Sequence, residues 1–385
     1  MTPKLSPDRR AAELNLLLDR IGSKLQLSTT AYSLAEDRYV TIGKFLRADG
    51  SLHRLKPWIY PQGSLRIGTT VKPKGRNEFD LDLVCLFLAH PGDFPNPTLL
   101  LEMVEQRFKG SETYRWMVER KNRCIRINYA NDFHMDILPA CPLPQAALHG
   151  EHAVVVPDCD ADEWSHSNPK GYALWFESTA EEAVRHLKRN IEGLPAQQDY
   201  EDLATLKRVV QLLKRNRDVA LMDIAERRRP ISIVLTTLAA TYYRGGTSAS
   251  DAVLEILDGM LNAIANAGLN RLVVTNPTNA NEDLSERWDA DPGSYRIFVN
   301  WVTDFRSKWV ELLGKSGIHN IKADLEDMFG ERIAREIIDE RMREIDAERR
   351  AGGLAVERGS GLIVPITVSS NNAAVRRNTF FGGGR

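Results

Sequence analysis

Aspartates in alternating patterns are the residues of this chain whose types and spacing could do chemistry. In segment 79–83, Asp80 and Asp82 alternate with apolar residues. Because residues i and i+2 of a strand point to the same face, the two carboxylates project together while Leu81 between them faces the core. Paired carboxylates on a rigid strand can hold divalent magnesium against a triphosphate.

Nucleotidyl transfer is the chemistry that fits such carboxylates. A hydroxyl attacks the α-phosphate of a nucleoside triphosphate in line, and pyrophosphate leaves. Two metal ions about 4 Å apart can stabilise the entering and the leaving oxygen, and a set of carboxylates holds them. Asp136 is the best candidate for the third carboxylate, because it stands between Met135 and Ile137 in a second alternating segment. We expect Asp136 to hold the catalytic metal and to take the proton from the attacking hydroxyl.

Gly63 and Ser64 form a sharp turn ahead of the aspartates. Gly63 allows the backbone to come close to a phosphate, and the Ser64 hydroxyl and amide can donate to the β- or γ-phosphate at a helix start. The alternative is an ordinary turn with an N-cap. An Asp-x-Asp pair alone is more often part of a solvated strand. Its combination with this turn and with Asp136 is much more specific.

Strand-like and helical patterns surround these residues and must position them. Ser6 and Pro7 are typical of a helix start, and Ser28 predicts the start of a second helix. Alternating segments predict a sheet with helices beside it. The expected strands are 58–60, 114–118, 124–129, 133–138 and 153–156, and a helix is expected over 97–108.

The strand signals fade from about Gly171 onward and long helical patterns replace them, which predicts a change of domain. Lys207, Gln211 and Lys214 lie on one face of a helix whose opposite stripe is apolar. Further helices are expected over 231–243, 298–313 and 321–349, and a flexible tail over 351–385.

Length and composition exclude several classes of protein. At 385 residues with 43% hydrophobic content, the chain suits two packed globular domains rather than a fibrous or disordered protein. A net charge of -1 gives no global attraction to nucleic acid or to an anionic membrane. The first residues lack the apolar core of a signal peptide, and no apolar run approaches the ~20 residues that span a bilayer. We therefore expect a cytoplasmic protein.

The four cysteines are scattered, which suits reduced thiols. Cys141, His149, His152 and Cys159 could be imagined as a zinc site. Their spacing lacks the close Cys or His pairs that pre-organise such a site. We therefore interpret these four side chains as loop residues without a metal role.

Taken in order, the Gly63-Ser64 pair and the segments EFDLDLV and FHMDILPA resemble the bacterial cGAS/DncV-like nucleotidyltransferases, the CD-NTase family. The resemblance runs from about residue 59 to residue 175, including SNPKGY at 167–172, and is weaker at 206–214 and 230–232. It implies an α+β fold in which a polymerase-beta-like core, a mixed sheet with helices, packs against a C-terminal helical domain. We expect the core with its N-terminal helices at 1–170, the helical domain closing the active-site cleft at 171–350, and the tail at 351–385.

The resemblance also implies a function. Such an enzyme makes a cyclic oligonucleotide second messenger, for example a cyclic dinucleotide such as a cyclic GMP-AMP isomer, from ATP, GTP or other NTPs in antiphage (CBASS) signalling. By position, the three aspartates match the ligands of two Mg²⁺ ions, for which Mn²⁺ can substitute. Gly63 and Ser64 match the phosphate-binding turn, and Lys207 and Ser232 match contacts to the distal phosphates.

Partners follow from the same resemblance. The diffusible product would reach a downstream effector, and the glycine-rich end raises the hypothesis of C-terminal conjugation or a regulatory protein partner, although Arg385 follows Gly384. No zinc-binding insertion is evident, so long-DNA binding is not expected, and the lack of a long apolar run argues against a membrane. Two alternatives stay open: a template-independent transferase acting on an RNA end or a small acceptor, and a catalytically silent nucleotide-binding scaffold.

Overall fold

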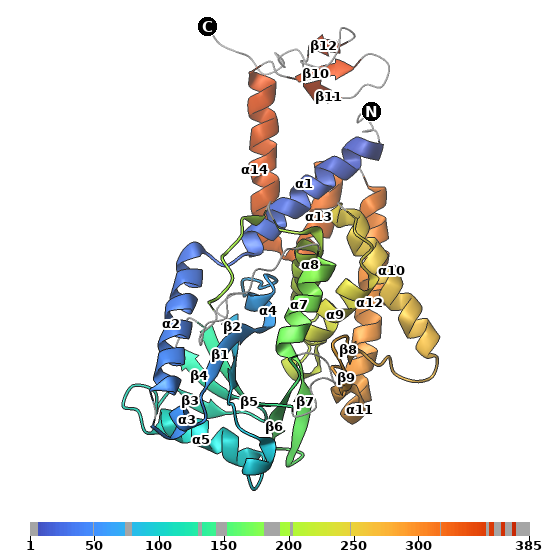
Figure 1. Cartoon of the computed structure of the whole chain (residues 1–385). Helices are drawn as coiled ribbons and strands as arrows, with labels where there is room; N and C mark the ends of the chain where they lie inside the picture. Colours follow the sequence, from blue (N-terminus) through green and yellow to red (C-terminus); the bar gives the residue numbers. More distant parts are fainter. Residues whose placement is uncertain are drawn as a thin grey trace.

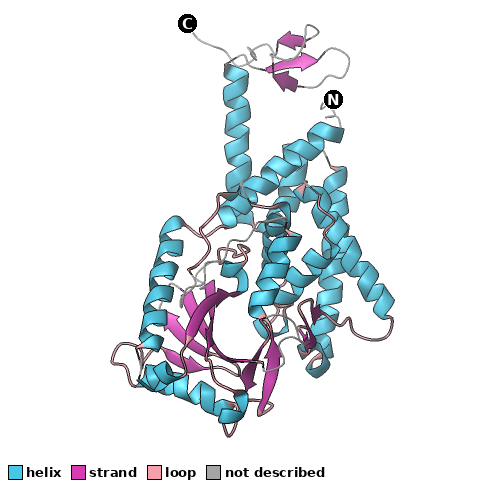
Figure 2. Ribbon diagram, viewed as in Figure 1, coloured by secondary structure: helices cyan, strands magenta, loops and turns pink. Residues whose placement is uncertain are grey.

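A computed structural model describes most of the chain as two lobes that meet side by side (Figure 1). The described residues are 7–48, 50–73, 79–129, 133–143, 152–180, 193–200, 203–246, 248–315, 317–351, 354–357, 363–365 and 372–374. One lobe contains a twisted sheet and the other is built from helices (Figure 2). None of the helices in these ranges combines the length and the apolar character that crossing a membrane requires.

The sheet places the two aspartate segments on neighbouring strands at its centre. Its main path runs β1 (Trp58–Gln62), β2 (Phe79–Leu86), β5 (Phe133–Pro142), β4 (Ile125–Tyr129) and β3 (Val118–Arg120). Strands β2 and β5 are parallel, while β1 and β4 flank them in antiparallel fashion. The hairpin of β6 (Val154–Asp158) and β7 (Glu163–Ser167) continues from the end of β5. The expected mixed sheet is therefore confirmed.

Alternation along the strands gives the sheet one apolar face and one mixed face. Leu81 and Leu83 of β2 lie with Met135 of β5 in a core cluster that also contains side chains of α2 (Thr29–Arg47) and α5 (Thr98–Lys109). Asp80 and Asp82, one residue out of phase, lie on the opposite face. The short helices α3 (Gly50–Arg54) and η1 (Pro91–Asp93) lie near the ends of strands β1 and β2.

The second lobe is organised around α8 (Thr205–Ala220), which contacts α1 (Pro7–Leu25), α9 (Ser232–Tyr242), α10 (Ala249–Ala267) and α13 (Ile318–Phe329). One large apolar cluster joins these helices, and the α1 side chains belong to it rather than to the core of the sheet. The boundary expected near residue 171 stays a prediction.

The remaining elements are α7 (Pro169–Thr179), η3 (Glu226–Arg228), β8 (Thr275–Asn276), β9 (Asn279–Asp283), α11 (Arg287–Ala290), α12 (Pro292–Gly314) and α14 (Glu331–Arg350).

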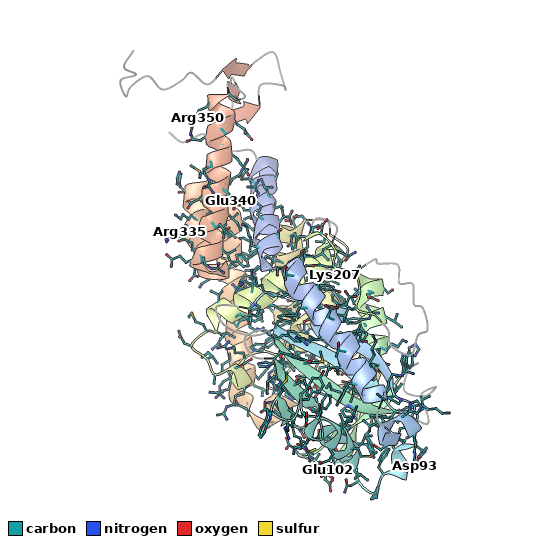
Figure 3. The ribbon with its side chains drawn as sticks, turned by 90° about the vertical axis from the view of Figure 1, so that its left-hand side faces the viewer. Asp93, Glu102, Lys207, Arg335, Glu340 and Arg350 are labelled. Atoms are coloured by element: carbon teal, nitrogen blue, oxygen red, sulfur yellow. The ribbon has the colours of Figure 1, made fainter. Side chains whose placement is uncertain are left out.

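Some expected elements differ from the structure in extent. The strand expected over 114–118 is wrong for most of its length, because residues 112–117 form turns and Trp116 is largely exposed. The helix expected over 321–349 is divided by Gly330, whose φ of 99° a helix does not tolerate. Figure 3 shows Arg335, Glu340 and Arg350 following one another along α14.

The tail expected over 351–385 lies mostly outside the described residues. Its described parts are short strands, β10 (Leu354–Glu357), β11 (Ile363–Pro365) and β12 (Asn372–Ala374), which pair as an antiparallel sheet with β10 in the middle.

Asn168 joins the two lobes at the start of α7. Its side chain, which is fully buried, accepts a hydrogen bond from the Gly171 amide and donates one to the Thr278 carbonyl at the β8–β9 turn. Its backbone amide and the Ser167 hydroxyl donate to the carboxylate of Glu282 on β9. The N-terminus of α7 is therefore fixed to the helical lobe through polar contacts.

We expect Asn168→Ala to lower the free energy of unfolding by about 1–3 kcal/mol, because it removes a helix cap and leaves a buried carbonyl without its donor. Chemical unfolding measures this loss. Asn262→Ala, at an exposed position in α10, is the matched control and is expected to change stability by less than about 0.5 kcal/mol. Equal effects in the two variants would contradict the role of Asn168 in joining the lobes.

Candidate active site

The three predicted carboxylates lie on one face of the sheet. In the parallel pairing of β2 with β5, Asp82 is opposite Asp136, and Asp80 is opposite His134. Paired residues of neighbouring strands share a face, and so do residues two apart along one strand. The register thus brings Asp80, Asp82 and Asp136 together as expected, with Asp80 exposed and the other two partly buried.

An arginine from the neighbouring strand lies against these carboxylates. Arg126 of β4 is opposite Asp136 in the antiparallel pairing. Its Nε and Nη2 each donate to one oxygen of Asp136 at 2.7 Å, and Nη2 also approaches Oδ1 of Asp80 at 3.4 Å. Sequence reasoning missed Arg126, although a charged residue between Ile125 and Ile127 is the same kind of signal that identified Asp136.

Crowding of negative charge alters the acidity of the site. Burial, followed by the charges of Asp136 and Asp80, raises the pKa of Asp82 to about 8. Burial also raises the pKa of Asp80, which the Arg126 guanidinium opposes. The site therefore favours an additional positive charge next to Asp82.

The glycine–serine pair lies directly beside Asp82. Gly63 begins the single-turn helix α4 (Gly63–Arg66) with a φ of 66°. A Cβ atom at this position would come 2.1 Å from Oδ2 of Asp82, so only glycine allows the turn to approach the carboxylate. The Ser64 hydroxyl is 3.1 Å from the hydroxyl of Thr70, which follows the turn. The predicted turn and the predicted carboxylates thus form one site.

The polar face of α8 lies against the segment that follows this turn. Gln211 donates to the Thr70 carbonyl at 3.0 Å, and Lys214 donates to the carbonyl and the hydroxyl of Thr69 at 3.1 and 2.9 Å. The ammonium nitrogen of Lys207 lies 3.2 Å from where a side chain on Gly68 would begin. Figure 3 labels Lys207 at the level where the helices meet the sheet lobe.

Lys214 is a functional candidate to which sequence analysis gave no role. Burial, and then the charge of Arg217, lower the pKa of Lys214 to about 7, while the charges of Asp218 and Asp82 act in the opposite direction. A neighbouring triphosphate would favour its ammonium form. Residues 207 and 214 are seven apart and share a helix face, so periodicity alone could not indicate which of the two lysines is the better candidate.

Ser232, the other predicted phosphate contact, is the first residue of α9. Its hydroxyl accepts a hydrogen bond from Nη1 of Arg217 at 3.1 Å. Arg217 lies one turn beyond Lys214 in α8 and also donates to the Pro230 carbonyl. Ser232 therefore lies beside the C-terminal half of α8, whereas Lys207 lies near its start.

Within the described residues, no three His, Cys, Asp or Glu side chains are arranged to hold a metal ion as they stand. Of the residues considered for zinc, Cys141 is buried in β5, and His149 lies outside the described residues. At the carboxylates, Arg126 occupies both oxygens of Asp136, so a cation there must displace the guanidinium.

Comparisons with known proteins give a consistent result. The model of the Second Messenger Oligonucleotide or Dinucleotide Synthetase domain matches residues 14–179. A c-di-GMP synthase of Roseivirga ehrenbergii is 31% identical over 374 residues, which cover 96% of this chain and 97% of that protein. The cyclic dinucleotide synthase CdnG of Bradyrhizobium diazoefficiens is 24% identical over 97% of this chain and 95% of that protein.

Solved structures share the fold. The structure of B. diazoefficiens CdnG in complex with GTP covers 85% of this chain and 98% of its own, with a TM-score of 0.69 and 22% identity. The complex of E. coli MS115-1 CdnC with HORMA-deltaN covers 84% of this chain and 96% of its own, with a TM-score of 0.58 and 13% identity. At these identities the structures support the likeness of fold alone.

Proposed function

Because this chain belongs to the bacterial CD-NTase family of nucleotidyltransferases, we propose that it joins GTP molecules into the cyclic dinucleotide c-di-GMP with release of pyrophosphate. Cyclic oligonucleotide synthesis is the activity of the enzyme, and the choice of guanine is the finer proposal. It is supported by the similarity over almost the whole chain to a c-di-GMP synthase. The cyclic GMP-AMP isomer expected from the sequence stays an untested prediction.

One observation carries the assignment of the active site: Gly63 places the turn with Ser64 against Asp82, on the face that also carries Asp80 and Asp136. In each of two successive steps, a ribose hydroxyl would form a bond to an α-phosphorus as the bond to pyrophosphate breaks. Asp136 is proposed to take the hydroxyl proton. Ser64 is proposed to donate to the leaving phosphates.

Divalent cations fit the donor set of this site. Asp80, Asp82 and Asp136 supply the carboxylate oxygens that Mg²⁺ or Mn²⁺ prefers, and their mutual repulsion favours a bound cation. When bound, two such ions would neutralise the charge that develops on the entering and leaving oxygens. The contribution of Arg126 is to balance the charge of Asp136 and Asp80, and it must release Asp136 to make the oxygens available.

Incubation with all four NTPs and Mg²⁺, followed by mass spectrometry of phosphatase-resistant products, tests the function. A cyclic guanine dinucleotide is the expected product. A mixed adenine–guanine ring would contradict the proposed base choice and leave the activity intact. A product that forms only when RNA or a small acceptor is added would favour the transferase alternative, and nucleotide binding without any product would favour the scaffold.

Lys214 and Lys207 can be distinguished as phosphate contacts. We propose that Lys214, together with Ser232 and Arg217, faces the distal phosphates. The charges of Asp82 and Arg217 both act on Lys214, and Arg217 donates to Ser232 at the start of α9. Lys214→Met is expected to raise KM for GTP by about ten- to a hundredfold, the worth of a charge-assisted hydrogen bond. Lys207→Met is the matched control with a smaller expected rise. The reverse order in steady-state kinetics would restore the role predicted for Lys207.

A place in antiphage (CBASS) signalling is part of the proposal. The product would diffuse to an effector, so neither long DNA nor a membrane is required as a partner. E. coli CdnC, a structural relative, has been solved in complex with HORMA-deltaN. A regulatory protein is accordingly a proposed partner class here, whereas the C-terminal end considered for conjugation lies outside the described residues.

A further inference from the structure

Helix α4 carries the Gly63–Ser64 pair and is anchored in both lobes at once. Leu65 is buried in the core of the sheet lobe, and Ile67, directly after the helix, is buried in the core of the helical lobe. Arg66 lies between them and is also buried. An isolated helical turn is unstable in water, so its orientation depends on tertiary contacts.

Arg66 forms a buried ion pair with Glu177 of α7. Its Nη1 donates to Oε1 of the carboxylate, and its Nη2 donates to Oε2 at 3.3 Å. Only 8% of each side chain is exposed. A two-point contact between a guanidinium and a carboxylate fixes direction as well as distance, which a single contact does not.

Helix α7 is itself held by both lobes. It contacts β1 and α9, and the Tyr172 hydroxyl lies 3.0 Å from the Thr237 hydroxyl of α9. Its N-terminus is fixed to the β8–β9 hairpin through Asn168. The ion pair between Glu177 and Arg66 therefore links the position of α7 to that of the turn that carries Ser64.

We propose that Arg66 and Glu177 are positioning residues, which set the distance of Ser64 from the carboxylates and thereby the affinity for a nucleoside triphosphate. Arg66 lies two residues beyond Ser64, and Gly63 lies against Asp82, so a small rotation of α4 moves the phosphate donors relative to the carboxylates. This inference rests on the proposed function, because it concerns binding of the same substrate.

Two variants separate positioning from general stability. Glu177→Gln keeps the shape of the side chain but removes its charge, and Arg66→Lys keeps the charge but loses the two-point contact. We expect Glu177→Gln to raise the Kd for GTP, measured by calorimetry with Ca²⁺ in place of Mg²⁺, by about tenfold or more, and KM with it. Arg66→Lys is expected to fall between this variant and the wild type. The fall in kcat is expected to be smaller than the rise in KM.

Asp19→Asn is the matched control. It removes a less buried ion pair, in which Asp19 of α1 accepts from Arg208 of α8 at 2.9 Å, outside α4 and α7. Hydrogen exchange of amides 63–70 is expected to accelerate in Glu177→Gln and to stay at the wild-type rate in Asp19→Asn.

These measurements distinguish an error in the positioning role of Arg66 and Glu177 from an error in the proposed function. A lower Tm in Glu177→Gln, with wild-type GTP affinity and wild-type exchange over residues 63–70, would overturn the inference. Failure of the wild type to bind GTP or to form product would count against the proposed function. The exchange comparison would still decide whether the pair orients the turn.

Discussion

Asp82→Asn is expected to reduce product formation by about a thousandfold or more without lowering Tm, because the amide keeps the shape of the side chain but removes metal-binding charge. Asp82 lies opposite Asp136 and two residues from Asp80 on one strand face. Burial and these neighbouring charges disfavour its ionised form in the fold. Loss of the charge therefore relieves repulsion, and an unchanged or higher Tm is expected.

Asp136→Asn provides a contrast at the same site. It is expected to remove activity to a similar extent, but also to lower Tm. The amide keeps one acceptor oxygen for Arg126 but replaces the other with an NH2 donor, and the partly buried guanidinium loses its ion pair. Asp160→Asn, in the exposed turn between β6 and β7, is the control that changes neither quantity.

Pyrophosphate release and thermal unfolding of the purified variants measure the two effects. Near-normal turnover by Asp82→Asn would refute the proposed carboxylate mechanism. A large loss of Tm in the same variant would instead assign the residue a structural role.

The carboxylate site could be predicted because its signal is local. The alternation that places Asp80 and Asp82 on one strand face is read from neighbouring residues, and Asp136 shows the same pattern. The structure adds the register that sets Asp82 opposite Asp136. An aspartate on each of two neighbouring strands forms such a pair only when the register sets the two residues opposite each other, as it does between β2 and β5.

Contacts between distant segments could not be predicted in this way. Arg66 and Glu177 are separated by 111 positions, and no periodicity relates a turn in one lobe to a helix that bridges both. Helix phase gives Lys207 and Lys214 the same face and therefore does not distinguish them, whereas in the structure Lys214 contacts Thr69 and Lys207 lies beside Gly68. Sequence patterns therefore predicted the group of aspartates that the fold brings together, but not the contacts that hold the surrounding elements in place.

Gly63→Ala is expected to lower kcat/KM by about a hundredfold or more, because both the backbone conformation of this position and the neighbouring Asp82 side chain disfavour an added methyl group. The φ of 66° is strained for alanine, and the added Cβ would come 2.1 Å from Oδ2 of Asp82. The variant must rotate α4 or displace the Asp82 carboxylate. Either change separates the phosphate donors from the metal-binding oxygens.

Gly268→Ala isolates the backbone contribution to this effect. Gly268 has a φ of 62°, close to that of Gly63, but a Cβ there would meet no atom within 4 Å. Its φ of 62° and ψ of -119° lie in a region that residues with a Cβ rarely adopt, so the variant is expected to lose about 1–3 kcal/mol of stability and to keep its turnover. Steady-state kinetics on both variants, at a temperature where both are folded, compare them directly. If the two lose activity equally, strain and not the contact with Asp82 explains the loss; if only Gly63→Ala loses it, the close approach of the turn to the carboxylate is what catalysis requires.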